Sequence, residues 1–176
     1  MGLAIGAKAA DFDLPGVDGK NYSLKGLNDK KALILIFSCN HCPYVQAYED
    51  RIIQIQKDYG SKGVQVVAIN SNDAVKYPDD NFENMKKRAK ELKFNFLYLR
   101  DESQKTAKDY SATHTPHIFL FNGKRELSYT GKIDDNWQEP AKVTKKYLRE
   151  ALDAILAGTP VSEPETFAIG CTIKWK

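Results

Sequence analysis

A continuous apolar segment at residues 32–37 leads directly into two cysteines, Cys39 and Cys42, and then into a helical pattern of apolar side chains over residues 43–59. An apolar run without alternation is typical of a strand buried on both faces of a largely parallel sheet. Pro43 suits the first position of a helix, where no backbone N–H is needed. The cysteines are therefore predicted to lie at a strand-to-helix turn of an α/β protein.

The rest of the chain repeats this alternation of strands and helices. Further strands are predicted at residues 64–69, 94–99, 117–121 and 126–130, and further helices at residues 80–92, 104–110 and 143–156. Residues 10–24 are predicted to form a β-hairpin that caps one edge of the sheet. Because no repeat or linker-like stretch separates these elements, we expect residues 1–176 to form a single domain with a C-terminal tail at 159–176.

Composition narrows the classes of function. The 42% hydrophobic content of these 176 residues is enough for one self-sufficient core. The 26 basic and 23 acidic residues leave a formal charge of +3, which creates no broad field for attracting nucleic acid. No signal-like or membrane-spanning apolar run is present in the sequence. We therefore expect a cytoplasmic protein without nucleic-acid or membrane partners, although an exported mature form would share these features.

The spacing of Cys39 and Cys42 is typical of redox or metal chemistry, and three cysteines are too few for a disulfide scaffold. A cysteine at the turn into a helix faces unpaired N–H groups and the positive end of the helix dipole, which favour its thiolate. We predict Cys39 as the nucleophile and Cys42, one helical turn along, as the thiol that resolves a mixed disulfide. His41 lies between them and can add positive charge. No bound cofactor is required.

Metal binding is the competing interpretation of the same motif. A structural zinc site would need a second cysteine pair, which the chain lacks, so redox chemistry is favoured and no metal site is predicted. A copper-delivery module could hold a soft ion with Cys39, Cys42 and a histidine such as His114. His114 and His117 flank Pro116, and we favour hydrogen bonding within that loop over contact with the cysteines.

Cys171 lies in the C-terminal tail, far from the cysteine pair in sequence. Its simplest role is that of a small buried hydrophobic residue. The alternative is an accessory thiol that resolves an oxidised Cys39 or Cys42.

A strand that ends in C-x-x-C before a helix, followed later by Thr115-Pro116 and a β-hairpin, is similar to the thioredoxin superfamily. A closer resemblance is carried by residues 6–14, 18–20, 39–45, 99–101, 115–121 and 170–175. In these segments the chain resembles the peroxiredoxin-like redoxins, which are related to the AhpC/TSA proteins.

The resemblance implies a thioredoxin-like fold, with a central mixed sheet flanked by helices, an N-terminal β-hairpin and an inserted helix–strand unit. It also implies a cis peptide at Pro116 and a Thr115 backbone that binds a substrate strand. The implied activity is disulfide exchange with protein thiols and disulfides, supported by a thiol reductant. His41 beside the second cysteine predicts a more oxidising couple than that of thioredoxin.

The same resemblance offers a weak thiol-dependent peroxidase as an alternative. Cys42, which precedes Pro43, lines up with the attacking cysteine of peroxiredoxins. Those enzymes carry a proline and a Thr or Ser seven and three residues upstream, where this chain has Leu35 and Cys39. The missing hydroxyl and the missing proline argue against efficient peroxidase chemistry.

Overall fold

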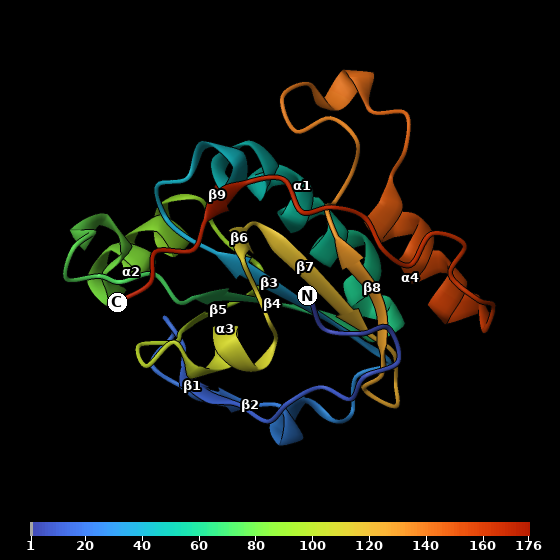
Figure 1. Ribbon diagram of the computed structural model, residues 1–176, viewed down its shortest axis with the longest axis horizontal. Helices are drawn as coiled ribbons and strands as arrows, with labels where there is room; N and C mark the ends of the chain where they lie inside the picture. Colours follow the sequence, from blue (N-terminus) through green and yellow to red (C-terminus); the bar gives the residue numbers. More distant parts are fainter. Residues whose placement is uncertain (1) are drawn as a thin grey trace.

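The computed structural model describes residues 2–176 and is built around a five-stranded mixed sheet (Figure 1). The strand order is β5-β4-β3-β7-β8. The strands are β3 (Ala32–Ser38), β4 (Val64–Asn70), β5 (Leu97–Arg100), β7 (His117–Phe121) and β8 (Leu127–Gly131). β3, β4 and β5 run parallel, while β7 is antiparallel to both β3 and β8. This is the mixed sheet predicted from the sequence.

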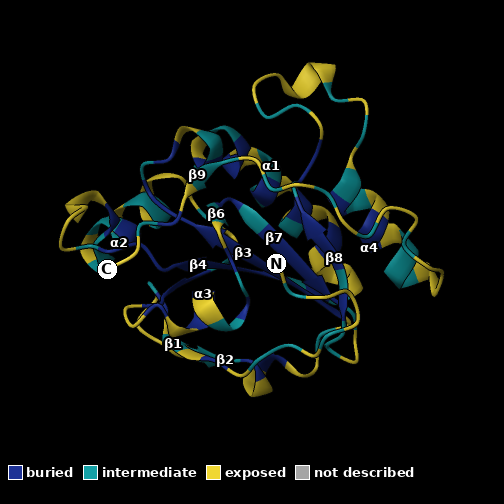
Figure 2. Cartoon of the chain, in the orientation of Figure 1, coloured by how far each residue is buried: buried dark blue, intermediate teal, exposed yellow. Residues whose placement is uncertain are grey.

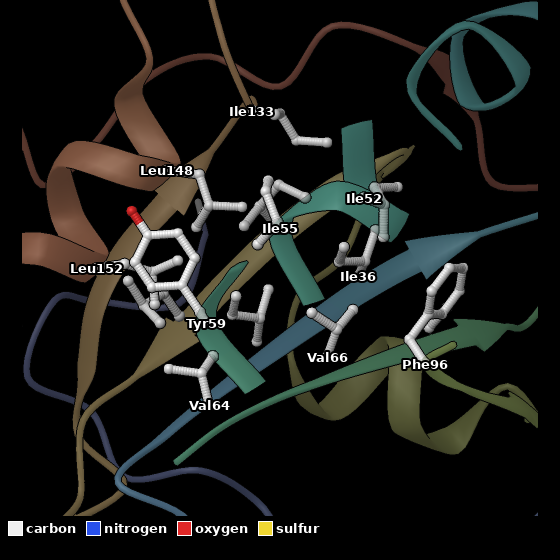
Figure 3. Packing of buried hydrophobic residues seen from close by; sticks show 14 of the residues in the cluster. Ile36, Ile52, Ile55, Tyr59, Val64, Val66, Phe96, Ile133, Leu148 and Leu152 are labelled. Carbon is white, nitrogen blue, oxygen red and sulfur yellow. The ribbon is translucent and has the colours of Figure 1, made fainter. Parts of the chain in front are cut away.

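Side chains of β3 alternate between two separate cores, one on each face of the sheet. On one face, Ile36 packs with residues of α1 (Pro43–Tyr59) and α4 (Tyr147–Ala157); Figure 3 shows this cluster at close range. On the other face, Leu35 packs with residues of α3 (Lys105–Asp109) and of the N-terminal segment. Figure 2 shows the central strands mostly in the dark blue of buried residues. The prediction of a strand buried on both faces is confirmed.

The N-terminal hairpin also forms as predicted. β1 (Asp13–Pro15) pairs antiparallel with β2 (Asn21–Ser23). An antiparallel bridge joins Gly16 to Leu99 of β5, which is an edge strand of the central sheet. The hairpin therefore caps that edge.

The strand predicted at residues 94–99 begins later, because the residues before it close the end of α2 (Phe82–Glu91). Lys93 adopts the left-handed conformation with φ of 55°. The N–H of Phe94 then donates to the carbonyl of Ala89 at 3.0 Å, which satisfies a free carbonyl of the last helical turn. β5 begins only at Leu97.

The helix predicted at residues 143–156 also begins later, at Tyr147. Before it, the chain is held in an irregular conformation by Asp135. The N–H and the hydroxyl of Thr144 donate to the Asp135 carboxylate, and the N–H of Asp135 donates to the carbonyl of Lys145. Gly158 ends the helix with a φ of 73°, as its position in the sequence predicts.

Two short strands that sequence periodicity did not reveal lie near the cysteines. β6 (His114–Thr115) pairs antiparallel with β9 (Cys171–Thr172), which belongs to the C-terminal tail. The Thr115–Pro116 peptide bond is cis, as the resemblance implied. Within residues 2–176, no helix combines the length and the apolar character that crossing a bilayer requires.

Candidate active site

Cys39 and Cys42 lie between the end of β3 and the start of α1, as the sequence predicted. Cys42 is the N-cap residue of α1 and Pro43 is its first helical residue. The carbonyl of Cys42 accepts the N–H of Gln46 at 2.9 Å, which is the first hydrogen bond of the helix. Both cysteines are only 1% exposed. The helix N-terminus is thus placed directly at the Cys42 sulfur.

Three sulfur atoms meet at this turn. Sγ of Cys42 lies 2.7 Å from Sγ of Cys171, and both residues are free thiols. Thr115 contacts the pair from β6: its hydroxyl lies 3.5 Å from Sγ of Cys39 and its carbonyl oxygen 3.4 Å from Sγ of Cys42. The tail therefore brings a third thiol into the predicted site.

Negative charge is best stabilised on the central sulfur, that of Cys42. The thiols of Cys39 and Cys171 donate to it, together with backbone N–H groups that include that of Val45, and this lowers the pKa of Cys42 despite its burial. The pKa of Cys39 is raised because its thiol donates to Cys42 and is buried near the carboxylate of Asp80. These contacts favour the thiolate form at Cys42 over that at Cys39.

Asp80 is a site residue that the sequence analysis missed. Its carboxylate is fully buried and accepts the N–H of Asn40 at 2.7 Å and the side-chain amide of Asn72 at 3.0 Å. Nδ1 of His41 lies 2.8 Å from Oδ2 of Asp80, at an angle outside that of a regular hydrogen bond. Nothing in the spacing links position 80 to the motif, because the contact depends on how the loop after β4 returns to the site.

The two other histidines, His114 and His117, both contact Thr113. Nδ1 of His114 lies 2.8 Å from the hydroxyl of Thr113, and Nδ1 of His117 accepts the N–H of Thr113 at 3.2 Å. Burial, with a smaller contribution from His114, lowers the pKa of His117 to about 4. Both side chains therefore hydrogen-bond within their own loop.

Among residues 2–176, the side chains whose metal-ligating atoms come together are those of Cys39, His41 and Asp80, with these atoms within 4.8 Å of one another. This group differs from the copper set considered from the sequence, which used Cys42 and His114. The Asp80 oxygens already accept hydrogen bonds from asparagine groups. The Asp80 carboxylate thus ties the backbone of Asn40, in the cysteine motif, to the side chain of Asn72.

The backbone edge of Thr115 carries β9. Thr115 is paired with Cys171, and Gly170 approaches so closely that an added Cβ would lie 2.1 Å from the Thr115 carbonyl oxygen. Only glycine fits at that position. The edge that the resemblance assigns to a substrate strand is therefore covered by the chain's own tail.

The sequence profile of the redoxin family matches residues 4–148, which include both cysteines of the motif. The chain belongs to the redoxin family. That membership assigns the protein to the oxidoreductases with a thioredoxin-type redox role, and the structural neighbours below share its thioredoxin-like fold. No protein with a curated description matches this redoxin.

Solved structures resemble this redoxin over most of its length. An uncharacterized conserved protein from Geobacillus kaustophilus shares 43% identity with a TM-score of 0.93, covering 98% of this chain and 93% of its own. A hypothetical protein from Sinorhizobium meliloti shares 39% identity with a TM-score of 0.94, and the match covers 100% of this chain and 97% of that protein. A putative thiol:disulfide interchange protein DsbE from Chlorobium tepidum shares 26% identity with a TM-score of 0.71, and the match covers 88% of this chain and 99% of that protein.

Proposed function

We propose that this redoxin is a thiol–disulfide oxidoreductase that exchanges disulfides with partner proteins through Cys39 and Cys42. The observation that carries the proposal is the placement of two buried thiols at the N-terminus of α1, where neighbouring donors lower the pKa of Cys42. The similarity to a putative thiol:disulfide interchange protein supports the same activity. A thiol reductant returns the pair to its dithiol form, and no bound cofactor takes part.

In the proposed reaction, the Cys42 thiolate attacks one sulfur of a partner disulfide, and the other partner sulfur leaves as a thiolate that takes up a proton. Cys39 then loses its proton and attacks Sγ of Cys42. The Cys39–Cys42 bond forms, and the partner departs with both thiols reduced. This order differs from the order predicted from the sequence, in which Cys39 attacks first.

Three neighbouring residues have supporting roles in this proposal. Thr115 contacts both sulfurs and keeps them at the same end of α1. Pro116 follows Thr115 in the cis peptide and is buried. His41 lies between the two cysteines, with its Nδ1 2.8 Å from the buried carboxylate of Asp80. A partner strand that pairs with Thr115 would have to displace β9.

Reduction of an insulin disulfide by dithiothreitol tests the activity itself. The wild-type protein should accelerate the reaction, and the double variant Cys39→Ser/Cys42→Ser should not. Equal rates for the two proteins would refute the proposal.

A trapping experiment tests the order of attack. Cys39→Ser/Cys171→Ser should accumulate mixed disulfides between Cys42 and partner proteins, because both neighbouring thiols that could resolve them are missing. Cys42→Ser/Cys171→Ser is the matched variant and should trap few partners. If this matched variant trapped more partners than Cys39→Ser/Cys171→Ser, Cys39 would be the attacking residue.

A second candidate function is weak thiol-dependent peroxidase activity. One observation favours it: the cysteine at the N-cap of α1, whose pKa is lowered there, is Cys42, which lines up with the attacking cysteine of peroxiredoxins. Peroxide would oxidise Cys42 to a sulfenic acid, and a neighbouring thiol would release water and form a disulfide. Consumption of hydrogen peroxide in the presence of dithiothreitol, lost in Cys42→Ser, would establish this activity.

A further inference from the structure

The three thiols of the site differ in their access to solvent. Cys39 and Cys42 are each 1% exposed, whereas Cys171 is only partly buried. Because Sγ of Cys171 lies 2.7 Å from Sγ of Cys42, a disulfide between them would need only a small movement of the two sulfurs. Cys171 is therefore placed between the buried pair and the surface.

The tail around Cys171 is fastened on both sides. Upstream, the N–H of Thr166 donates to the carbonyl of Thr130 at 3.0 Å. Downstream, the N–H of Ile173 donates to the carbonyl of Thr113 at 3.0 Å, and the N–H of Lys174 donates to the side-chain oxygen of Asn72 at 2.9 Å. The Ile173 side chain is buried in the core. Cys171 is thus held at Cys42 by contacts that do not involve the sulfurs.

β9 also occupies the position that the resemblance assigns to a substrate strand. It pairs antiparallel with β6, and Cys171 lies opposite Thr115. In this arrangement the tail acts as a tethered substrate, with its cysteine aimed at Cys42.

We propose that Cys171 is a third redox-active thiol, which accepts the disulfide from the Cys39–Cys42 pair and presents it at the surface to an external dithiol reductant. This inference rests on the proposed disulfide exchange, because that reaction produces the oxidised Cys39–Cys42 pair.

The transfer is a disulfide exchange without net oxidation. The Cys171 thiol loses its proton and attacks Sγ of Cys42. The Cys42–Cys171 bond forms, the Cys39–Cys42 bond breaks, and Cys39 leaves as a thiolate that takes up a proton.

The external dithiol then reduces the Cys42–Cys171 disulfide. One thiolate of the dithiol attacks Sγ of Cys171, and Cys42 leaves as a thiolate. The second thiol of the reductant attacks the mixed disulfide, which releases Cys171 and closes a disulfide within the reductant. Each disulfide broken is matched by one formed, and the reductant is the species oxidised.

The electrostatics of the site suit this sequence of steps. Stabilisation of the Cys42 thiolate makes it a good leaving group when Cys171 is attacked. Burial and donation to Cys42 raise the pKa of Cys171 in the reduced site to about 11. When Cys42 is held in a disulfide it carries no charge, so the Cys171 thiol no longer donates to a thiolate. Loss of this hydrogen bond eases the deprotonation of Cys171.

The bond itself can be tested in full-length Cys39→Ser, which retains only Cys42 and Cys171. Mild oxidation by diamide should remove both free thiols in the monomer, and peptide mass mapping should find Cys42 linked to Cys171. Protein that stays reduced, or that forms only intermolecular dimers, would overturn the proposal. Gly170→Ala provides a second variant with all three thiols, in which the collision with Thr115 should lower the yield of the Cys42–Cys171 linkage.

The role of Cys171 in reduction is tested by Cys171→Ser. After oxidation, its Cys39–Cys42 disulfide should be reduced by dithiothreitol at least about tenfold more slowly than the wild-type disulfide, because the buried sulfurs must be attacked directly. Phe167→Ala is the control, since this side chain lies in the same tail and is 90% exposed; its rate should equal that of the wild type.

The outcomes separate this inference from the proposed function. Unchanged reduction of Cys171→Ser would overturn the role of Cys171, even where the protein reduces insulin. A wild-type protein that forms the Cys42–Cys171 linkage but leaves insulin unreduced would refute the proposed function alone.

Discussion

At the scale of single residues, the site is organised around the sulfur of Cys42 and the carboxylate of Asp80. Cys42 receives hydrogen bonds from two thiols and from the backbone N–H groups of Val45 in α1 and of Cys171 in β9. Asp80 holds the backbone of Asn40 and lies beside His41. The donors around Cys42 lower its pKa. The charge of Asp80 contributes to the raised pKa of Cys39.

Replacing Asp80 should change the acidity of Cys39. In a Cys42→Ser/Cys171→Ser background, Asp80→Asn should lower the pKa of Cys39, because a nearby negative charge is removed. The rate of alkylation by iodoacetamide as a function of pH measures this shift. Asp79→Asn is the matched control, since the Asp79 side chain is exposed. An equal Cys39 pKa in both variants would exclude a direct effect of the Asp80 charge.

The thiolate of Cys42 should be visible in the reduced protein well below the ordinary cysteine pKa of about 8.5. Its ultraviolet absorbance should persist at neutral pH and be absent from Cys42→Ser. Folding lowers the pKa of Cys42 to about 4, so the Cys42 thiolate stabilises the folded state. This stabilisation is complete above the pKa of an unfolded cysteine and is lost as the pH falls to the lowered pKa of Cys42. An absorbance that appears only above neutral pH would contradict the assignment.

At the scale of helices and strands, local patterns predicted the elements that position the motif. The period of apolar residues and Pro43 predicted the bounds of α1, and the apolar run predicted β3 to within one residue. β5 and α4 start later than predicted because hydrogen bonds at Lys93–Phe94 and at Asp135 take residues out of regular structure. Such tertiary contacts leave no periodic signal.

The end of α2 offers a test of this explanation. Lys93→Gly should stabilise the protein by about 0.5–1 kcal/mol, because glycine adopts the left-handed conformation without steric cost. Lys90→Gly, inside the same helix, should instead destabilise it by about 1 kcal/mol. Urea unfolding of both variants measures the difference, and a change of the same sign in both would contradict the explanation.

At the scale of the whole molecule, the C-terminal tail crosses the sheet end and completes the site. Cys171 was recognised from the sequence as a possible accessory thiol, but its contact with Cys42 spans 129 positions and no spacing rule could predict it. The same holds for β9, whose two residues are too few for a periodic pattern. The sequence located the reactive pair, and long-range packing added its neighbours.

The tail should contribute to the stability of the entire fold. Ile173 is 3% exposed and packs in the core on the α3 side of the sheet. Ile173→Ala should therefore cost about 2–4 kcal/mol of unfolding free energy, measured by urea denaturation. Ile169→Ala, in the same tail with a 40% exposed side chain, should change stability by less than about 0.5 kcal/mol. Equal effects would show that the tail is not part of the cooperative unit.

The sequence separation of 129 between Cys42 and Cys171 has a thermal consequence if their sulfurs join. The Cys39–Cys42 bond closes a ring of only a few residues, whereas the alternative bond would turn most of the unfolded chain into a covalent loop. Loop-closure entropy favours the larger ring by roughly 3 kcal/mol of folding free energy. The same protein at the same oxidation level would then melt at two different temperatures, according to which partner Cys42 holds.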